Sequence, residues 1–277
     1  MISKPGLGLV NNEDCIGSST NACWVIDGAT KITKPNVTGL NEVIWFVTQV
    51  SSHLEQSIHQ EDLSISSILA DILSIIETKY KATFQTETID EEMIGASILI
   101  VRYVNQQLEL FSLGDCAAYI QTQDQEITFQ NQAIKQLEAV KIGKIFSQRQ
   151  DYSSLPFSEF RQQIIIPELK KIKQENKDNQ VFSVLKINPQ LVFGGLTCTI
   201  PISSSTQILL TSDGFSRMID TYYIFKNFQA FLEYLKVKNV EALFHLLRET
   251  EKHDPEAIKF PRLKISDDAS LILTTIN

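Results

Sequence analysis

The chain has 277 residues, of which 43% are hydrophobic and 21% charged, and its formal net charge is −8 at pH 7. This is the composition of a globular protein with enough apolar surface to form a core, so it excludes a disordered chain. The acidic balance, with a pI of about 5.1, excludes the basic surface that nucleic acid or anionic lipid needs, and neither is expected as a partner.

The cysteine pattern and the absence of long apolar runs bear on the compartment. The four cysteines are far apart and form no CxxC pair, which argues against a zinc ribbon or a disulfide framework and favours a reducing compartment. The N-terminal segment lacks the apolar centre of a signal peptide, and no stretch reaches the ~18 apolar residues of a membrane span. We therefore expect a cytoplasmic protein.

Short apolar runs that end in Gly or Asp predict strands, and apolar residues at helical spacing predict helices. In chain order, the predicted elements are a strand at Ala22–Ile26, helices at Leu40–Ile58 and Leu63–Phe84, strands at Ala96–Val104, Leu108–Leu113 and Ala117–Gln121, a helical block at Phe157–Asn176, a strand at Gln207–Thr211, helices at Tyr223–Lys236 and Val240–Thr250, and a strand at Ser270–Ile276.

The order of these elements predicts an α+β fold. Strands cluster in meanders: RYVNQQLELF reads as two strands joined at Asn105–Gln107, and YIQTQDQEITF as another pair joined near Thr122–Gln125, which implies antiparallel hairpins. Helices come in separate blocks, whereas a doubly wound parallel sheet would alternate strand and helix. We expect a four-layer αββα sandwich, in which two stacked, mainly antiparallel sheets are flanked by helices. Residues 1–277 are expected to form a single domain, with a mobile helical or flap insertion around residues 144–189, the least strand-like region.

Aspartates stand at the ends of several predicted strands. Asp27 ends CWVIDG, Asp115 ends LFSLGD, Asp213 lies in ILLTSDG, and Asp267 and Asp268 precede the last strand. One such Asp is usually a turn former or a helix cap. When strand ends converge, however, several carboxylates repel one another unless a cation neutralises them or some take up protons. Oxygen ligands without His or Cys favour Mg²⁺ or Mn²⁺ over zinc.

Six segments, in this order and strand context, make the chain resemble the metal-dependent PPM (protein phosphatase 2C) family. Any single match is weak, but the ordered set extends over nearly the whole chain. The segments are NED at Asn12–Asp14, VIDGAT at Val25–Thr30, GAS at Gly95–Ser97, LGDCAAY at Leu113–Tyr119, LLTSDGF at Leu209–Phe215 and DDAS at Asp267–Ser270.

The resemblance implies a binuclear Mg²⁺ or Mn²⁺ centre. By this resemblance, Asp27 bridges two ions, the carbonyl of Gly28 binds one of them, and Asp213 and Asp267 hold the other. Asp115 is available with Asp213 for a third, weaker ion. The remaining implied site residues, Glu13 and Asp14, orient metal-bound waters as indirect or direct ligands.

The same resemblance implies a reaction and a substrate. A metal-activated water attacks a phosphomonoester in line, without a phosphoenzyme, and the substrate is a protein that carries phosphoserine or phosphothreonine. Metal ions that position the water and the phosphoryl group and balance their negative charge suffice for phosphoryl transfer. We expect a monomeric signalling enzyme. The alternatives are a catalytically weak PPM-like module that binds phosphoproteins or regulates a partner, and a phosphatase for small phosphomonoesters.

The chain departs from the family pattern in ways that bear on phosphate binding and on the metal ligands. Leu9 stands where many members carry a phosphate-binding arginine, and Lys4, Lys31 or Lys34 could substitute for it, although surface lysines are the commoner reading. An ammonium lacks the bidentate geometry of a guanidinium.

Two further departures concern the late motif and the helix after the Ser-Asp-Gly segment. The late Asp-Asn of the family is Asp267-Asp268 here. The alignment of the following strand favours Asp267 as the metal ligand, and Asp268 is the alternative. Arg217 occupies the place where some members carry an extra aspartate.

Overall fold

The computed structural model describes residues 1–29, 41–89, 94–175, 184–202 and 205–276. The chain divides into two compact units. The first, here called the sheet unit, comprises Met1–Asn131, Ser183–Phe215 and Asp268–Asn277. The second, here called the helical unit, comprises Gln132–Phe182 and Ser216–Asp267.

The sheet unit contains two five-stranded sheets, and all neighbouring strands in them are antiparallel. The first sheet has the order β2 (Cys15–Ser18), β3 (Ala22–Gly28), β4 (Ala96–Val104), β5 (Gln107–Leu113) and β8 (Leu196–Pro201). The second sheet has the order β1 (Ile2–Lys4), β10 (Ala269–Ile276), β9 (Thr206–Thr211), β6 (Ala117–Gln121) and β7 (Glu126–Phe129).

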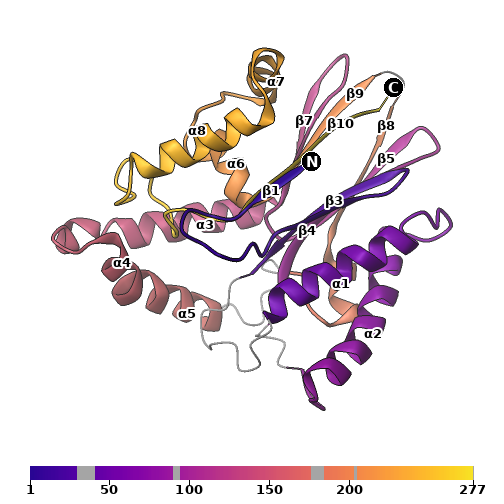
Figure 1. Ribbon diagram of the computed structural model, residues 1–277, viewed down its shortest axis with the longest axis horizontal. Coiled ribbons are helices and arrows are strands. Elements are labelled where there is room, and N and C mark those ends of the chain that lie inside the picture. Colours follow the sequence, from indigo (N-terminus) through magenta and orange to yellow (C-terminus); the bar gives the residue numbers. More distant parts are fainter. Residues whose placement is uncertain (30–40, 90–93, 176–183, 203–204, 277) are drawn as a thin grey trace. The chain divides into compact units, whose positions relative to one another are not determined.

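Side-chain alternation along β3 explains how the first sheet is buried on both faces, because successive residues of a strand point to opposite sides. Cys23 and Val25 belong to one core cluster with Ile120 and Leu210 of the second sheet. Trp24 belongs to another core cluster, which includes the apolar faces of α1 and α2. The two sheets therefore stack face to face, and the helix pair covers the outer face of the first sheet (Figure 1).

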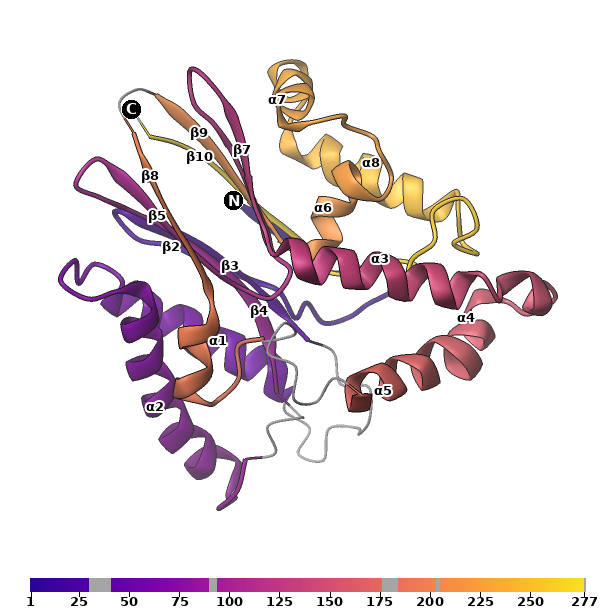
Figure 2. The same cartoon turned by 180° about the vertical axis from the view of Figure 1, so that it is seen from behind.

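The helix pair of the sheet unit consists of α1 (Glu42–Ser57) and α2 (Ile65–Phe84). Both begin at a polar capping residue, as helix N-termini prefer. The Asn41 side chain accepts hydrogen bonds from two backbone N–H groups of α1, and the Ser64 hydroxyl accepts one from α2. Seen from behind in Figure 2, α2 runs beside the 3-10 helix Pro189–Gly194 that leads into β8, and the two pack together.

The helical unit is built from short helices around apolar side chains such as Phe157, Phe160 and Ile165. Its helices include α3 (Gln132–Phe146), α4 (Phe157–Phe160), α5 (Ile166–Glu175), α7 (Phe228–Val237) and α8 (Val240–Lys252). Helix α6 (Asp213–Asp220) begins in the sheet unit and ends in the helical unit.

The α+β class with two stacked antiparallel sheets and flanking helices is confirmed, as are all six predicted strands, within two residues at each end. The hairpins β4–β5 and β6–β7 form as expected. The single-domain expectation stays a prediction, as does the mobile insertion at 144–189, of which residues 176–183 lie outside the described residues.

Two predicted helices differ from the observed ones for local reasons. The block predicted at Phe157–Asn176 is interrupted by a π-helical turn at Arg161–Ile165. Pro167 lies two residues after this turn, and a proline lacks the N–H that a regular helix would bond to the carbonyl four residues earlier. The helix predicted at Tyr223–Lys236 excludes Tyr223, which has a left-handed φ of 53°, and begins at Phe228, where the Asn227 side chain caps it by accepting from the Ala230 N–H.

Among the described residues, no helix is both long enough and apolar enough to cross a membrane.

The turn before Asp115 gives a first test of the fold. Gly114 has a φ of +110°, and a Cβ there would lie 2.8 Å from the Cα of Ser97. We expect Gly114→Ala to lower the free energy of unfolding by about 2–4 kcal/mol, through backbone strain and overpacking. Urea unfolding followed by circular dichroism measures the change.

Gly143→Ala is the matched control, since Gly143 lies inside α3 and an added Cβ meets nothing within 4 Å. Alanine is the better helix former, so this variant should gain about 0.5–1 kcal/mol. Equal stabilities for the two variants would contradict the strained turn.

Candidate metal centre

The register of the first sheet brings two of the predicted aspartates together. Asp27, at the end of β3, pairs with Ser97 at the start of β4. The Ser97 hydroxyl donates a hydrogen bond to Asp115 Oδ1 (2.6 Å) and accepts one from the Asp115 backbone N–H (3.2 Å). Carboxylate oxygens of Asp27 and Asp115 and the sulfur of Cys116 all lie within 4.8 Å of one another. Two carboxylates this close favour a shared cation.

Asp213 approaches the same strand ends from the second sheet. It is the first residue of α6 and follows β9 through Ser212. Its backbone N–H donates to Asp27 Oδ2 at 3.4 Å. This hydrogen bond joins the start of α6, which follows β9 of the second sheet, to the end of β3 in the first sheet. Asp27 therefore has a predicted site residue beside it from each sheet, namely Asp115 after β5 and Asp213 after β9.

Gly28 lets the N-terminal segment approach β3 closely. The Gly28 N–H donates to the carbonyl oxygen of Glu13 (3.2 Å), and a Cβ at Gly28 would lie 2.6 Å from that oxygen. The Glu13 side chain is held from another direction, because Asn41 Nδ2 donates to Glu13 Oε1 (3.0 Å). Only a glycine fits here, and Glu13 is therefore fixed beside the end of β3.

Asp14 is a buried carboxyl group among other acids. The Ser212 hydroxyl donates to Asp14 Oδ2 (2.8 Å), whereas the buried Oδ1 has no hydrogen-bond partner in the described part of the chain. The pKa of Asp14 is raised to about 7, mainly by burial and also by the charges of Asp268 and Asp213, against the lowering effect of hydrogen bonds from Ser270 and Ser212. The buried, unpartnered oxygen and the carboxylate donor set fit a hard divalent cation.

Asp268 serves as an anchor for the N-terminal segment. Its Oδ1 accepts from the Gly6 N–H (3.0 Å), and its Oδ2 accepts from the Glu13 N–H (2.7 Å). Charge-assisted bonds of this kind are stronger than neutral ones. Asp268, the alternative metal ligand expected from the sequence, therefore accepts a backbone hydrogen bond at each of its carboxylate oxygens.

Asp267, the favoured ligand in this motif, belongs to the helical unit. Arg217 Nη2 lies 3.0 Å from Asp267 Oδ2, and Lys264 Nζ lies 2.7 Å from Asp267 Oδ1. Each oxygen of this carboxylate thus has its own cationic side chain. Its surroundings differ in charge from those of Asp14, whose pKa is raised by the charges of Asp268 and Asp213.

The predicted site residues are therefore found in two settings. The sheet unit holds six of them; within this unit the carboxylates of Asp27 and Asp115 lie close together, and the backbone N–H of Asp213 donates to the Asp27 carboxylate. Those six are Glu13, Asp14, Asp27, Gly28, Asp115 and Asp213. The seventh, Asp267, lies in the helical unit.

The candidate replacements for the phosphate-binding arginine are only partly described. Leu9 is 49% exposed, and Lys4 is partly buried in β1. Lys31 and Lys34 lie outside the described residues. No replacement for the arginine is assigned among them.

Sequence reasoning missed the polar residues that hold the acidic ones. Asn41, Ser97 and Ser212 position Glu13, Asp115 and Asp14, respectively. Asn41 could have been found, because an Asn immediately before an apolar-periodic helix is an N-cap signal. The roles of Ser97 and Ser212 could not be predicted from the sequence, since they depend on which strands pair.

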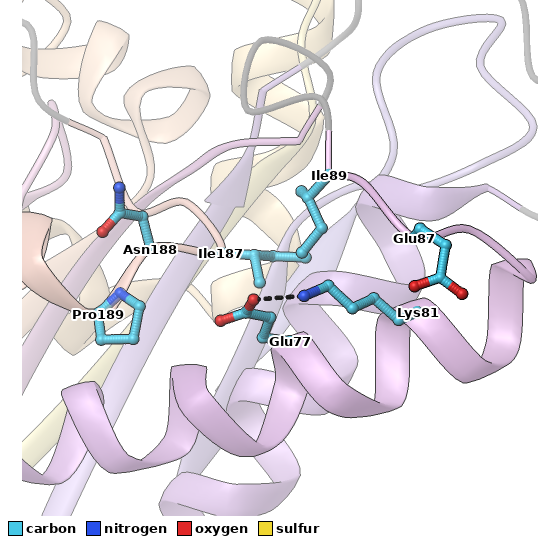
Figure 3. Close-up of a pocket in the computed structure, with 7 residues that line it drawn as sticks. All are labelled: Glu77, Lys81, Glu87, Ile89, Ile187, Asn188 and Pro189. Carbon is cyan, nitrogen blue, oxygen red and sulfur yellow. Dashed lines mark hydrogen bonds and ion pairs between the residues drawn. The ribbon is translucent and has the colours of Figure 1, made fainter.

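Two surface cavities of the sheet unit lie away from these aspartates. One, of about 320 Å³, contains an ion pair between Glu77 and Lys81 of α2 at 2.7 Å (Figure 3). Its lining residues are Glu77, Lys81, Glu87, Ile89, Ile187, Asn188 and Pro189. The other, of about 470 Å³, is lined mainly by residues 18–23 and by β10. None of the candidate metal ligands thus lines either cavity.

The cysteines near the site behave as packing residues. Cys116 is fully buried, and burial, together with the nearby carboxylates, raises the pKa of its thiol well above the usual value. Burial also raises the pKa of Cys15. A raised pKa lowers the thiolate fraction and hence the reactivity.

Comparison with known proteins is consistent with this arrangement. A sequence model of the protein phosphatase 2C family matches residues 10–248. No curated protein sequence matches the chain significantly.

Solved structures share the fold at low sequence identity. The catalytic domain of the serine/threonine phosphatase PstP in complex with two manganese ions has a TM-score of 0.56 and 13% identity, covering 100% of this chain and 96% of that one. Stp1 from Staphylococcus aureus has a TM-score of 0.56, 14% identity and coverages of 100% and 93%. MsPP from Mycobacterium smegmatis, with cacodylate, has a TM-score of 0.56, 12% identity and coverages of 98% and 95%.

The buried thiols allow a chemical test. Burial raises the pKa of Cys23 to about 12, and this residue is only 8% exposed, whereas Cys198 on β8 is partly exposed. At pH 8, we expect iodoacetamide to label Cys23 at least roughly tenfold more slowly than Cys198, as measured by peptide mass spectrometry over time. In denaturant the difference should vanish. Equal labelling of the native protein would show that the β3 thiol is accessible.

Proposed function

Because the chain belongs to the protein phosphatase 2C family, we propose that it is a Mg²⁺- or Mn²⁺-dependent serine/threonine phosphatase that hydrolyses phosphomonoesters in proteins. The observation that supports the proposal is that carboxylate oxygens of Asp27 and Asp115 lie within 4.8 Å of each other, and that the backbone N–H of Asp213 donates to Asp27. The charges of Asp27, Asp115 and Asp213 also all act on the buried thiol of Cys116. Carboxylates brought together beside a buried, unreactive thiol favour metal-assisted hydrolysis over covalent catalysis. The phosphatase PstP, with the same fold, was solved with two manganese ions.

In this proposal, Asp27 and Asp213 hold the metal, the carbonyl of Gly28 adds a neutral ligand, and Asp115 supplies a further carboxylate. Divalent ions bound there would supply the positive charge that stabilises phosphoryl oxygens and promotes attack by water. The number of ions, two or three, and their identity are part of the proposal. The role of Asp267, the remaining ligand that the family implies, is considered in the next subsection.

The chain's own residues prepare the site for this chemistry. Asp14 Oδ1 is a buried acceptor placed to orient water, because its other oxygen is fixed by Ser212. Glu13 is fixed through its backbone and its side chain, by Asp268 and Asn41 respectively. Residues fixed in this way do not have to reorganise during the reaction, which is the main source of electrostatic catalysis.

A second candidate function is a catalytically weak module that binds phosphoproteins or regulates a partner. Two observations favour it, namely Leu9 in place of the phosphate-binding arginine and the two cations on Asp267. A phosphatase for small phosphomonoesters is the third candidate, since none of the proposed site residues would distinguish one phosphomonoester from another.

Hydrolysis of para-nitrophenyl phosphate with Mn²⁺ tests the proposed activity. We expect turnover that EDTA abolishes, and Asp27→Asn should lower kcat/KM by roughly a hundredfold or more, because a metal ligand and a transition-state charge are lost together. The release of nitrophenolate gives the rate, and a phosphoserine peptide assayed for free phosphate extends the test to protein substrates.

Asp71→Asn is the matched control, since Asp71 is an exposed aspartate on α2, and it should keep the wild-type rate. Turnover that survives EDTA, or an unchanged rate in Asp27→Asn, would refute the metal-dependent enzyme. Absent turnover with micromolar phosphopeptide binding would instead support the binding module.

A further inference from the structure

We propose that Asp267 is the central anion of an internal ion triad with Arg217 and Lys264, and that these two side chains, not a divalent cation, balance its charge. The inference refines the metal centre and, in that respect, rests on the proposed function. It removes from the centre one ligand that the family pattern implies and assigns that carboxylate a role within the helical unit.

The geometry of the triad is that of a fully paired carboxylate. Arg217 Nη2 is 3.0 Å from one oxygen of Asp267, and Lys264 Nζ is 2.7 Å from the other. The side chains of Arg217 and Asp267 are only 11% and 12% exposed. Solvent therefore screens this pair much less than a surface ion pair.

The segment that carries Asp267 is held in place by a second basic residue. Arg248 of α8 donates to the backbone carbonyl of Asp267 (2.9 Å) and to the Ser266 hydroxyl (2.8 Å). Arg248 is itself paired with Glu251, whose side chain is fully buried (2.9 Å), and Ser266 donates to the same carboxylate (2.7 Å). The backbone of Asp267 is thus fixed to α8, so its carboxylate is not free to move away from Arg217 at little cost.

Charge balance argues against a divalent ion at this carboxylate. Arg217 and Lys264 each approach one oxygen of Asp267, and a divalent ion bound to that carboxylate would be repelled by both of them. In the sheet unit, by contrast, the charges of Asp268 and Asp213 act on Asp14. A metal ligand set therefore fits the acidic strand ends and does not fit Asp267.

The sequence explains how the triad arises. Some family members carry an aspartate four residues after the Ser-Asp-Gly aspartate, and this chain carries Arg217 there. Arg217 therefore places a cation, one turn into α6, where it pairs with Asp267. Lys264, three residues before Asp267, contributes the second cation.

Thermal unfolding in EDTA tests the triad without any metal. Asp267→Asn leaves Arg217 and Lys264 close together without their anion, so its Tm should fall by about 3–6 °C. Adding Arg217→Gln removes one of the two repelling cations, so the double variant should be more stable than Asp267→Asn alone. This rescue is a coupling that two independent residues would not show.

The control is Lys252→Gln, which removes a cation from an exposed ion pair with Glu249 on α8. This variant should neither lower the Tm appreciably nor rescue Asp267→Asn.

Mn²⁺ titration followed by electron paramagnetic resonance counts the bound ions directly. Asp267→Asn should keep the wild-type number of bound ions and an affinity within about threefold of wild type, whereas Asp27→Asn should weaken binding at least roughly tenfold. Loss of one ion in Asp267→Asn, or an affinity loss equal to that of Asp27→Asn, would overturn the inference.

The two experiments separate failure of the inference from failure of the proposed function. A raised Tm of Asp267→Asn in EDTA is expected of a metal ligand relieved of acidic repulsion, and it would overturn the triad. Rescue by Arg217→Gln in a protein that binds no Mn²⁺ would keep the triad and refute the metal centre.

Discussion

The structure of the sheet unit depends on one electrostatic constraint, which is that carboxylates at converging strand ends must be balanced. Antiparallel pairing puts Asp27 opposite Ser97 and thereby next to Asp115, and the start of α6 adds Asp213. Water cannot screen these charges fully, because Asp14 beside them is buried and its pKa is raised to about 7, first of all by burial. A hard cation is the least costly solution, which is why the arrangement favours metal chemistry.

Neutral polar residues and backbone groups make this crowding tolerable. Ser97 and Ser212 each donate a hydroxyl to a carboxylate, and Asn41 donates its amide to Glu13 while it caps α1. Asp268 anchors the backbone of the N-terminal segment. The acidic side chains are therefore held by groups that come from both sheets and from the helix pair, so their positions follow from the core packing rather than from local loops.

The chain balances its acids in two different ways. At the strand ends of the sheet unit, acids neighbour acids, and an external cation would be needed. In the helical unit, buried or partly buried acids have basic partners built into the sequence, as in Arg262–Asp254 (2.6 Å), Arg248–Glu251 (2.9 Å) and the pairs of Asp267. These three acids thus have cationic partners within the helical unit, and the sheet unit offers the better ligand set for a metal.

The sequence by itself determined six of the strands, the two hairpins and the strand-end aspartates, because apolar alternation and the position of Asp after a buried run are local properties. It did not indicate β1, β2 and β8. Tertiary structure alone decided which acids share an environment. Asp267 and Asp268 are adjacent in sequence, yet the first pairs with Arg217 and the second with the backbone of Gly6 and Glu13. Adjacent residues of an extended segment point to opposite sides, and only the fold determines whether a cation or a backbone amide lies there.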